Sequence, residues 1–285
     1  VGAEGEIIDG VANTTNNGYG DMSPSISVVS GFSVAAWVRL FEELGAKGEG
    51  EAITADEYTR LLNSTEVMAA IYTGGSWTTT QLTENASSDL APVTAANDDS
   101  AIVFWRGVYT ADAGFFDSDG STPTAPKFET RDAIYFRQYS GGWGETKMAY
   151  NGSLGSVVGI QTAMLSDGSS IVVFVIDRGS DDPEDPSKGS EIAYPTVDAS
   201  GGLGDLVVLT SDSETDTNPQ VMAVSSTPGV FLLGWYSTRD GGDIRLQAVG
   251  ADGQLYGAGS AYAVPESVRA IADEDALDIS ADFQF

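Results

Sequence analysis

The sequence predicts an all-β fold, a β-propeller of four four-stranded blades. Two motifs recur in the same order along the 285 residues, and a short apolar run follows each recurrence. The first is a Gly-Gly turn before an aromatic residue or Leu, at Gly74-Gly75-Ser76-Trp77, Gly141-Gly142-Trp143 and Gly201-Gly202-Leu203, with a weaker copy at Asp252-Gly253-Gln254-Leu255. The second is Asp-x-x-Pro, at Asp21–Pro24, Asp89–Pro92 and Asp216–Pro219. Because both motifs keep the same phase, the repeat is the strongest signal in the sequence.

Each repeat is expected to contain four strands, named A to D in chain order. Strand A follows Asp-x-x-Pro, and strand B is a run rich in Val, Ile and aromatic residues. Strand C alternates, as in Asp132–Arg137 and Asp243–Gln247, and strand D follows the Gly-Gly turn, as in Trp77–Thr83. The expected B strands are Phe32–Val38, Ala101–Trp105, Ile171–Ile176 and Val230–Trp235. The Trp residues at or near three of their ends, Trp37, Trp105 and Trp235, are expected to pack between blades.

We expect one domain over residues 1–285, with repeats at 16–83, 84–150, 151–210 and 211–261. In the third repeat the Asp-x-x-Pro motif is expected at Ser156–Gly159, where neither signature residue is present. Residues 4–15 and 275–285 have strand-like patterns, so the two termini would close a fifth blade, or else the four blades belong to a larger propeller. A β-sandwich or a β-solenoid with irregular repeats is the alternative architecture.

Long insertions separate strands B and C in the first two repeats, at residues 40–64 and 107–131. Within the first, Thr54–Leu62 is predicted to be a helix, because Thr54 and Glu57 have capping-box spacing. In a propeller blade the B-to-C and D-to-A loops lie at the same end. Functional residues are therefore expected at this rim, since they concentrate on elaborated loops.

Composition excludes several classes of function. The formal net charge is −29, and so acidic a surface repels nucleic-acid backbones and anionic lipid. The chain has no Cys and no His, which excludes Cys nucleophiles, thiolate or imidazole metal sites and Ser-His-Asp catalysis. Carboxylate-based glycosidases are the main enzyme class that remains. No apolar run is long enough to predict a membrane-spanning helix, and the composition suits a secreted or cell-surface protein.

An Arg follows strand B in every repeat, at Arg39, Arg106, Arg178 and Arg239. The Asp of Asp-x-x-Pro is expected at the same rim, so the favoured interpretation is a set of structural ion pairs that fix neighbouring loops. The expected pairs are Asp21 with Arg39, Asp89 with Arg106, and Asp216 with Arg239. The alternative is an arginine cluster that binds an anionic sugar or another carboxylate ligand.

Loop 107–131 holds further candidate ligands. Its Asp117-Ser118-Asp119-Gly120 segment resembles the start of a calcium loop, but Phe128 stands where the closing Glu belongs, so an Asx turn is favoured over bound Ca²⁺. No other cofactor is expected. The aromatic residues Tyr109 and Phe116 either stack on sugar rings or cover the edge of the core. Four glycosylation sequons are expected to be mostly unused turn sequences, at Asn13, Asn63, Asn85 and Asn151.

The segment Ile134–Glu145, with its Gly-Gly-Trp turn, carries a family resemblance together with the order of the motifs. It resembles the repeat of bacterial extracytoplasmic β-propellers of the sialidase-like type, over residues 6–257. A sialidase Asp-box reads Ser-x-Asp-x-Gly-x-x-Trp, and no such string stands in this sequence. The resemblance therefore implies the fold and leaves the activity open.

The sequence favours a non-catalytic, extracytoplasmic or cell-surface binding or scaffold module whose loop-rich rim binds a glycan or a surface protein. One alternative is a sialidase-like, glycan-active hydrolase with carboxylate catalysis, although no feature pairs Glu66, Glu145 or Glu191. Another is a structural subunit of a surface assembly, in which the alternating strand Leu277–Phe285 pairs with another chain.

Overall fold

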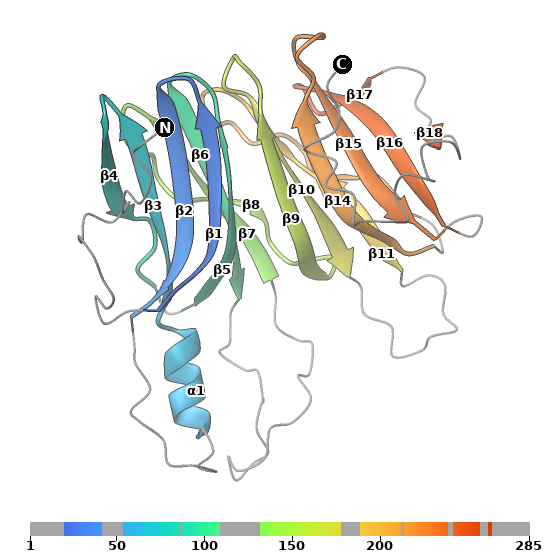
Figure 1. Cartoon of the computed structure of the whole chain (residues 1–285). Helices are drawn as coiled ribbons and strands as arrows, with labels where there is room; N and C mark the ends of the chain where they lie inside the picture. The colour runs from blue at the N-terminus through green and yellow to red at the C-terminus, as the bar shows by residue number, and fades with distance from the viewer. Residues whose placement is uncertain are drawn as a thin grey trace, which may run out of the picture. The chain divides into compact units, whose positions relative to one another are not determined.

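A computed structural model describes residues 20–41, 54–85, 87–108, 132–177, 189–211, 214–238, 242–256 and 262–263. The chain divides into two compact units, Val1–Ser153 and Leu154–Phe285. Each unit contains two antiparallel sheets, which we call blades 1 to 4 in chain order. In every blade the four main strands lie side by side in the order of the sequence, as an up-and-down meander (Figure 1).

Unit 1 consists of blades 1 and 2 with one short helix. Blade 1 contains β1 (Gly20–Val29), β2 (Phe32–Leu40), β3 (Thr65–Thr73) and β4 (Ser76–Gln81). Blade 2 contains β5 (Ser88–Ala96), β6 (Ser100–Val108), β7 (Asp132–Ser140) and β8 (Lys147–Tyr150). Helix α1 (Ala55–Leu62) lies in the connection between β2 and β3.

Unit 2 consists of blades 3 and 4. Blade 3 contains β9 (Ser156–Met164), β10 (Ser170–Asp177), β11 (Ser190–Tyr194), β12 (Thr196–Val197) and β13 (Val207–Val208). Strand β12 continues the ladder of β11 on β10 after Pro195, which has no N–H to donate. Blade 4 contains β14 (Asp216–Ala223), β15 (Val230–Ser237), β16 (Asp243–Gly250), β17 (Leu255–Tyr256) and β18 (Tyr262–Ala263).

The predicted fold class, all-β with four consecutive four-stranded blades, is confirmed by these sheets. All four expected B strands lie inside β2, β6, β10 and β15. Helix α1 confirms the predicted helix, and its capping box is present: Glu57 N–H donates to Thr54 Oγ1 at 3.3 Å, and Thr54 N–H donates to Glu57 Oε2 at 2.9 Å. The strands expected at residues 4–15 and 275–285 lie outside the described residues, and the single domain over 1–285 stays a prediction.

The hydrophobic core of each unit lies between its two blades. In unit 1, β2, β3 and β6 contribute buried Val, Ala, Ile and Phe side chains around Trp105, which is 1% exposed. In unit 2, β10, β11 and β15 do the same around Trp235, which is 3% exposed. Trp105 and Trp235 therefore pack between blades, as predicted. Trp37 instead packs against Met68, Ala70 and Trp77 of its own blade.

Each Asp-x-x-Pro motif forms a bulge in strand A. The pairing of strands A and B shifts register between Met22 and Ser25, between Leu90 and Val93, and between Thr217 and Gln220. The residue before each Pro has a left-handed backbone, with φ of 52° at Ser23, 48° at Ala91 and 52° at Asn218. The unpaired positions of a bulge tolerate a proline, because no ladder hydrogen bond is lost there.

Blade 3 keeps the bulge without the motif. The shift falls opposite Phe174, and Gly159 is the residue with a left-handed φ of 62°. The equivalent of Asp-x-x-Pro is therefore Val157–Ile160, one residue later than the expected Ser156–Gly159. Val157 and Phe174, both fully buried, occupy the places of the Asp and the Trp. The polar pair of the other blades is replaced here by two apolar residues together.

The strained backbone at Ala91 gives a test of the bulge. Ala91 is exposed, so Ala91→Gly removes the Cβ penalty of the left-handed conformation without losing packing. We expect the free energy of unfolding of unit 1 to rise by up to about 1 kcal/mol in urea titrations. Asn218→Gly is the matched control, since Asn tolerates this conformation, and it should gain less. Destabilisation by Ala91→Gly would contradict the assigned backbone.

Candidate functional site

The candidate residues gather at the end of each blade where strand A begins, strand B ends and strand C begins. We call this end the B–C rim, because it carries the long B-to-C connections. In blade 1 the register places Asp21 opposite Arg39 and Arg39 opposite Glu66. In blade 2 Asp89 lies opposite Gly107. The rim of unit 1 therefore brings charged side chains from β1, β2, β3 and β5 to the same end of two packed sheets.

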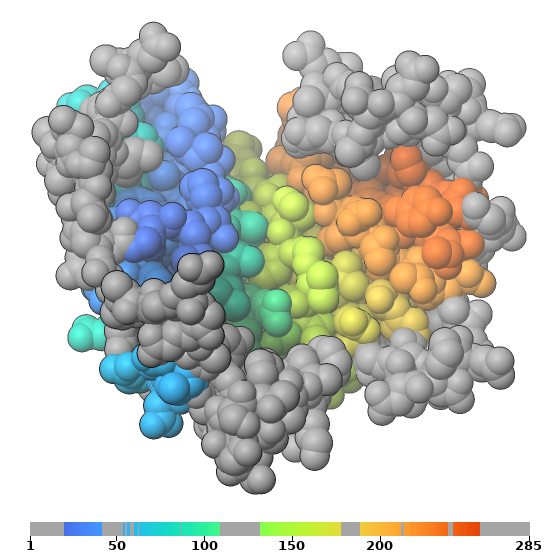
Figure 2. Space-filling view, turned by 60° about the horizontal axis from the view of Figure 1, so that its bottom comes forward, coloured from blue at the N-terminus to red at the C-terminus, as the bar shows by residue number. Residues whose placement is uncertain are grey.

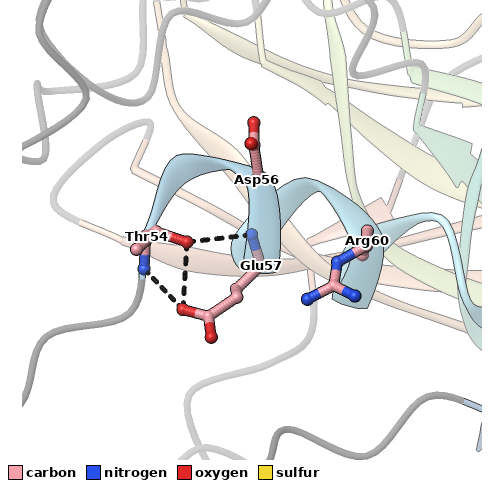
Figure 3. Close-up of a pocket in the computed structure, with 4 residues that line it drawn as sticks. All are labelled: Thr54, Asp56, Glu57 and Arg60. Atoms are coloured by element: carbon pink, nitrogen blue, oxygen red, sulfur yellow. Dashed lines mark hydrogen bonds between the residues drawn. The ribbon is translucent and has the colours of Figure 1, made fainter.

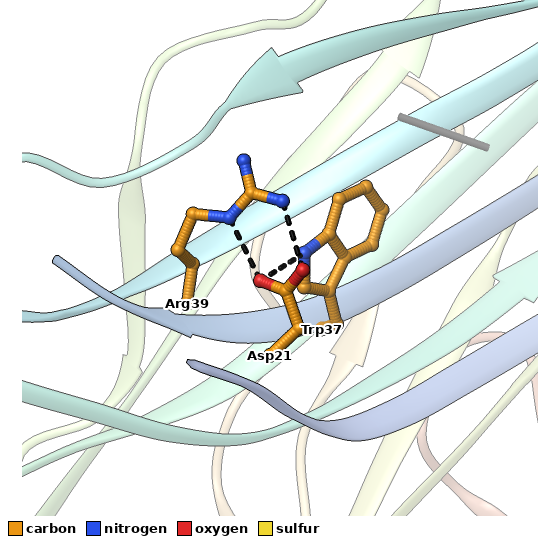
Figure 4. A network of polar contacts seen from close by, with 3 residues as sticks. All are labelled: Asp21, Trp37 and Arg39. Carbon is orange, nitrogen blue, oxygen red and sulfur yellow. Dashed lines mark hydrogen bonds and ion pairs between the residues drawn. The ribbon is translucent and has the colours of Figure 1, made fainter. Parts of the chain in front are cut away.

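Arg39 forms the predicted ion pair with Asp21 (Figure 4). Its Nε donates to Asp21 Oδ1 at 2.7 Å and its Nη2 donates to Oδ2 at 2.9 Å, which is a bidentate fork. Trp37 Nε1 donates to the same Oδ1 at 3.1 Å, and the guanidinium lies 5.8 Å from the centre of the Trp37 ring. Arg39 is thus engaged by a carboxylate and an aromatic ring.

The predicted pair between Arg106 and Asp89 is wrong. Arg106 Nη2 instead lies 2.9 Å from Oδ2 of Asp132, a carboxylate that is 1% exposed. Arg39 stands two residues after its Trp, whereas Arg106 follows Trp105 directly, so the alternation of a strand turns it to the opposite face. Gly107 occupies the equivalent place, and a Cβ there would lie 2.7 Å from the Tyr135 ring.

The Asp of the motif has a different partner that all three copies share. Trp37, Trp105 and Trp235 each donate their indole N–H at 3.1 Å to the Asp of their own blade, namely Asp21, Asp89 and Asp216. Asp89 and Asp216 are each only 1% exposed. The Asp-x-x-Pro motif is therefore the acceptor for the strand-B Trp, and the bulge is what lets the two meet.

A second carboxylate, Glu66, lies close to Asp89 in unit 1 and is 6% exposed. Burial, the largest cause, raises the pKa of Asp89 to about 6, and the charge of Glu66 acts in the same direction. Hydrogen bonds from Thr83, Asn85 and Trp105 oppose this shift. Burial also raises the pKa of Glu66. Two buried carboxyls that interact in this way tend to share one proton.

Thr83 links the two carboxyl groups to strand β3. Its side chain interacts with both Glu66 and Asp89 and lowers the pKa of each. Its oxygen also accepts the backbone N–H of Val67 at 2.8 Å.

Unit 2 repeats this arrangement between blades 3 and 4. Thr210 Oγ1 accepts the backbone N–H of Ile192 at 2.9 Å, next to Glu191, which is 1% exposed. Thr210 precedes Asp216 by six residues, as Thr83 precedes Asp89. Strand β11 packs against β14 as β3 packs against β5. The buried carboxylates are therefore a repeated feature of the fold.

Neither Arg39 nor Arg106 lines either of two surface pockets that lie among the described residues. One pocket, of about 490 Å³, lies beside α1 and is lined by polar side chains (Figure 3). Helix α1 is exposed at the surface of unit 1 (Figure 2). The lining residues of this pocket are Thr54, Asp56, Glu57 and Arg60. The other, of about 310 Å³, lies on blade 4 at the A-to-B end of the sheet, between Met222, Ser226, Leu232 and Tyr256.

The structure describes two of the predicted ligand-binding residues, Arg39 and Arg106. The remaining candidates lie outside the described residues and stay predictions: Arg178, Arg239, Tyr109, Phe116, and the calcium ligands Asp117 and Asp119. Within the described part of the chain, Asp and Glu side chains form no group of three that would hold a metal ion. The described segments also contain no helix with the length and apolarity needed to cross a membrane.

The cluster around Thr83 was not predicted from the sequence. One signal for it is present: a Leu-Thr pair stands six residues before the Asp in two repeats, at Leu82-Thr83 and Leu209-Thr210. Both Leu residues donate their N–H to strand C, Leu82 to Val67 at 2.7 Å and Leu209 to Ile192 at 2.8 Å. A comparison of repeats through the D-to-A connection would have found the pair.

No model of a protein family matches the chain, and no curated protein matches it. Solved structures do. A Hadza microbial sialidase shares 11% identity with a TM-score of 0.44, over 81% of this chain and 44% of its own. The Trypanosoma rangeli sialidase shares 10% identity with a TM-score of 0.45, over 86% of this chain and 38% of its own. The chain thus spans less than half the length of these sialidases.

A family 117 glycoside hydrolase from the marine bacterium Zobellia galactanivorans is also similar. It shares 10% identity with a TM-score of 0.45, over 89% of this chain and 73% of its own.

The stability of unit 1 should depend on the protonation of Asp89. Its folded pKa of about 6 exceeds the ordinary value of 3.8, so the folded state holds the proton more tightly. The associated stability is complete below about pH 4 and is lost as the pH rises through about 6, by roughly 3 kcal/mol. Urea unfolding of wild type and Asp89→Asn between pH 4 and 7.5 measures this, because the variant lacks the titration. Parallel pH profiles for the two proteins would contradict it.

The indole hydrogen bond should matter most where the carboxylate is buried. Trp105→Phe keeps an aromatic ring but removes a donor to Asp89, which we expect to cost about 1–3 kcal/mol of unfolding free energy at pH 7. Trp37→Phe is the matched control, because the Asp21 side chain is 37% exposed and keeps the fork from Arg39. It should cost less than 1 kcal/mol, and equal losses would refute the argument.

Proposed function

We propose that this protein is a non-catalytic, extracytoplasmic or cell-surface binding module that contacts a glycan or a protein through its B–C rim. The observation that carries the proposal is that the two arginines of the described rim already have internal partners. Arg39 is held by Asp21 and Arg106 by Asp132. The strand ends at the rim therefore serve as a rigid support, and the connections they carry are left to recognise a ligand.

The pocket beside α1 is the described surface that suits this role. It is polar and lies on the B-to-C insertion of blade 1. Its capping box fixes the start of the helix, so the exposed side chains of Asp56 and Arg60 are presented on an ordered element. A polar pocket with both charges suits hydroxyl-rich or zwitterionic groups, such as those of glycans and peptides.

A second candidate is carboxylate-based glycan hydrolysis, and one observation favours it. Glu66 and Asp89 form a pair with raised pKa values, and a glycosidase needs one carboxyl protonated near neutral pH. Burial opposes this role, since these side chains are 6% and 1% exposed and contact between a catalytic acid and its substrate requires access. The third candidate, assembly through Leu277–Phe285, concerns residues outside the described part of the chain.

The test is a glycan array with sialylated, uronic-acid and neutral glycans, followed by hydrolysis assays on the same glycan classes. Glycans are tested before proteins because the sequence repeat resembles that of sialidase-like propellers. Arg60→Ala should weaken binding at least tenfold while keeping the helix, since Ala is the best helix former. Tyr256→Ala, at the opposite end of a blade, is the control and should bind normally. Turnover that Asp89→Asn abolishes would instead support the hydrolase, and equal loss of binding in both surface variants would refute the rim.

A further inference from the structure

The connection between β8 and β9 contains an exposed glycosylation sequon, Asn151-Gly152-Ser153. Both Asn151 and Ser153 are exposed. Asn151 Oδ1 accepts the backbone N–H of Ser153 at 3.1 Å, and Gly152 turns the chain with a φ of 73°. Among the described residues the Asn151 amide nitrogen makes no hydrogen bond, so this nitrogen projects from a fixed side chain.

We propose that Asn151 is an N-glycan acceptor, an inference that rests on the proposed extracytoplasmic location. The donor would be an oligosaccharide linked to a lipid phosphate. The Asn151 amide nitrogen attacks the anomeric carbon, the new N–C bond forms, and the C–O bond to the phosphate breaks. One amide proton passes to a base of the transferase, and the lipid phosphate leaves with the bonding electrons. No oxidation or reduction is involved.

The Asn85 sequon makes the same turn, since Ser87 N–H donates to Asn85 Oδ1 at 2.6 Å, but its amide nitrogen and its third residue are engaged in the fold. Asn85 Nδ2 donates to Asp89 Oδ2 at 2.8 Å, so a glycan on this nitrogen would disturb the buried carboxyl pair. The third residue, Ser87, is 5% exposed and its hydroxyl donates to Asn85 Oδ1. In this fold the acceptor nitrogen is already hydrogen-bonded, and the hydroxyl that a transferase must recognise is buried and bonded to Asn85.

The Asn63 sequon is also inaccessible to a transferase in the folded chain. Asn63 is half-buried at the end of α1. The third residue, Thr65, is 5% exposed and its hydroxyl bonds to Ser88 across the two blades at 2.9 Å. Of the three sequons in the described part of the chain, Asn151 is therefore the one in which both the Asn and the third residue are exposed. Asn13 lies outside it.

The position of Asn151 places the proposed glycan at the B–C rim. Strand D ends and strand A begins at the B–C rim, and Tyr150 pairs with Ile134 near the start of β7. A glycan on Asn151 would stand at the rim end of blade 2, in the segment that joins the two compact units. It would limit which partners approach this part of the rim.

The full-length chain carrying Asn13→Gln should be produced in a secretory host with an oligosaccharyltransferase. Intact mass and glycopeptide mapping are expected to show one glycan, on Asn151. Asn151→Gln and Ser153→Ala should each remove it, while the sites Asn63 and Asn85 stay unmodified. An unmodified Asn151 in the secreted protein, or a glycan on Asn63 or Asn85, would overturn the proposal.

The proposed function is tested separately with chain made in a bacterial cytosol, which carries no glycan. If the cytosolic protein binds its ligand but the secreted protein carries no glycan on Asn151, only the proposed modification is overturned. A glycan on Asn151 without ligand binding would overturn only the binding function.

Discussion

The hydrogen bond from a buried indole to an aspartate at the start of strand A is the constraint on which blades 1, 2 and 4 depend. It requires a bulge in strand A, because only the extra residue brings the Asp onto the Trp of strand B. The bulge in turn places a non-glycine residue in a left-handed backbone and uses the proline at a position without a ladder hydrogen bond. One polar contact thus accounts for the whole Asp-x-x-Pro motif.

Blade 3 shows why the Asp and the Trp are either both present or both replaced. A buried carboxylate without its donor, or an indole without its acceptor, loses hydrogen bonds that water would have supplied. Replacing both partners by apolar groups avoids that cost, as Val157 and Phe174 do. Blade 3 lacks the Asp–Trp pair, and it also lacks the proline of the motif. Gly159 is the residue with the left-handed backbone in its bulge.

Most of the fold could be predicted from the sequence because turns and β-rich runs are local signals. The side on which a strand residue points is less secure, since a shift of one position reverses it. This is why Arg39 met its predicted partner and Arg106 did not. The Glu66–Thr83–Asp89 cluster was harder still, because its members come from three separate segments and share no motif. Only the spacing of Leu82-Thr83 and Leu209-Thr210 from the next Asp carried information about it.

The same constraint decides how the raised pKa of Asp89 should be interpreted. For Asp89 to reach a substrate, the start of β5 would have to separate from β6, and the bond from Trp105 would break. Trp105 is part of the core between blades 1 and 2, so that movement would open the core as well. Hydrolysis by Asp89 would therefore require the fold to break the contact that organises blade 2, whereas the proposed recognition by the B-to-C connections would leave that contact intact. The raised pKa of Asp89 is in this view a result of packing two sheets over a polar pair.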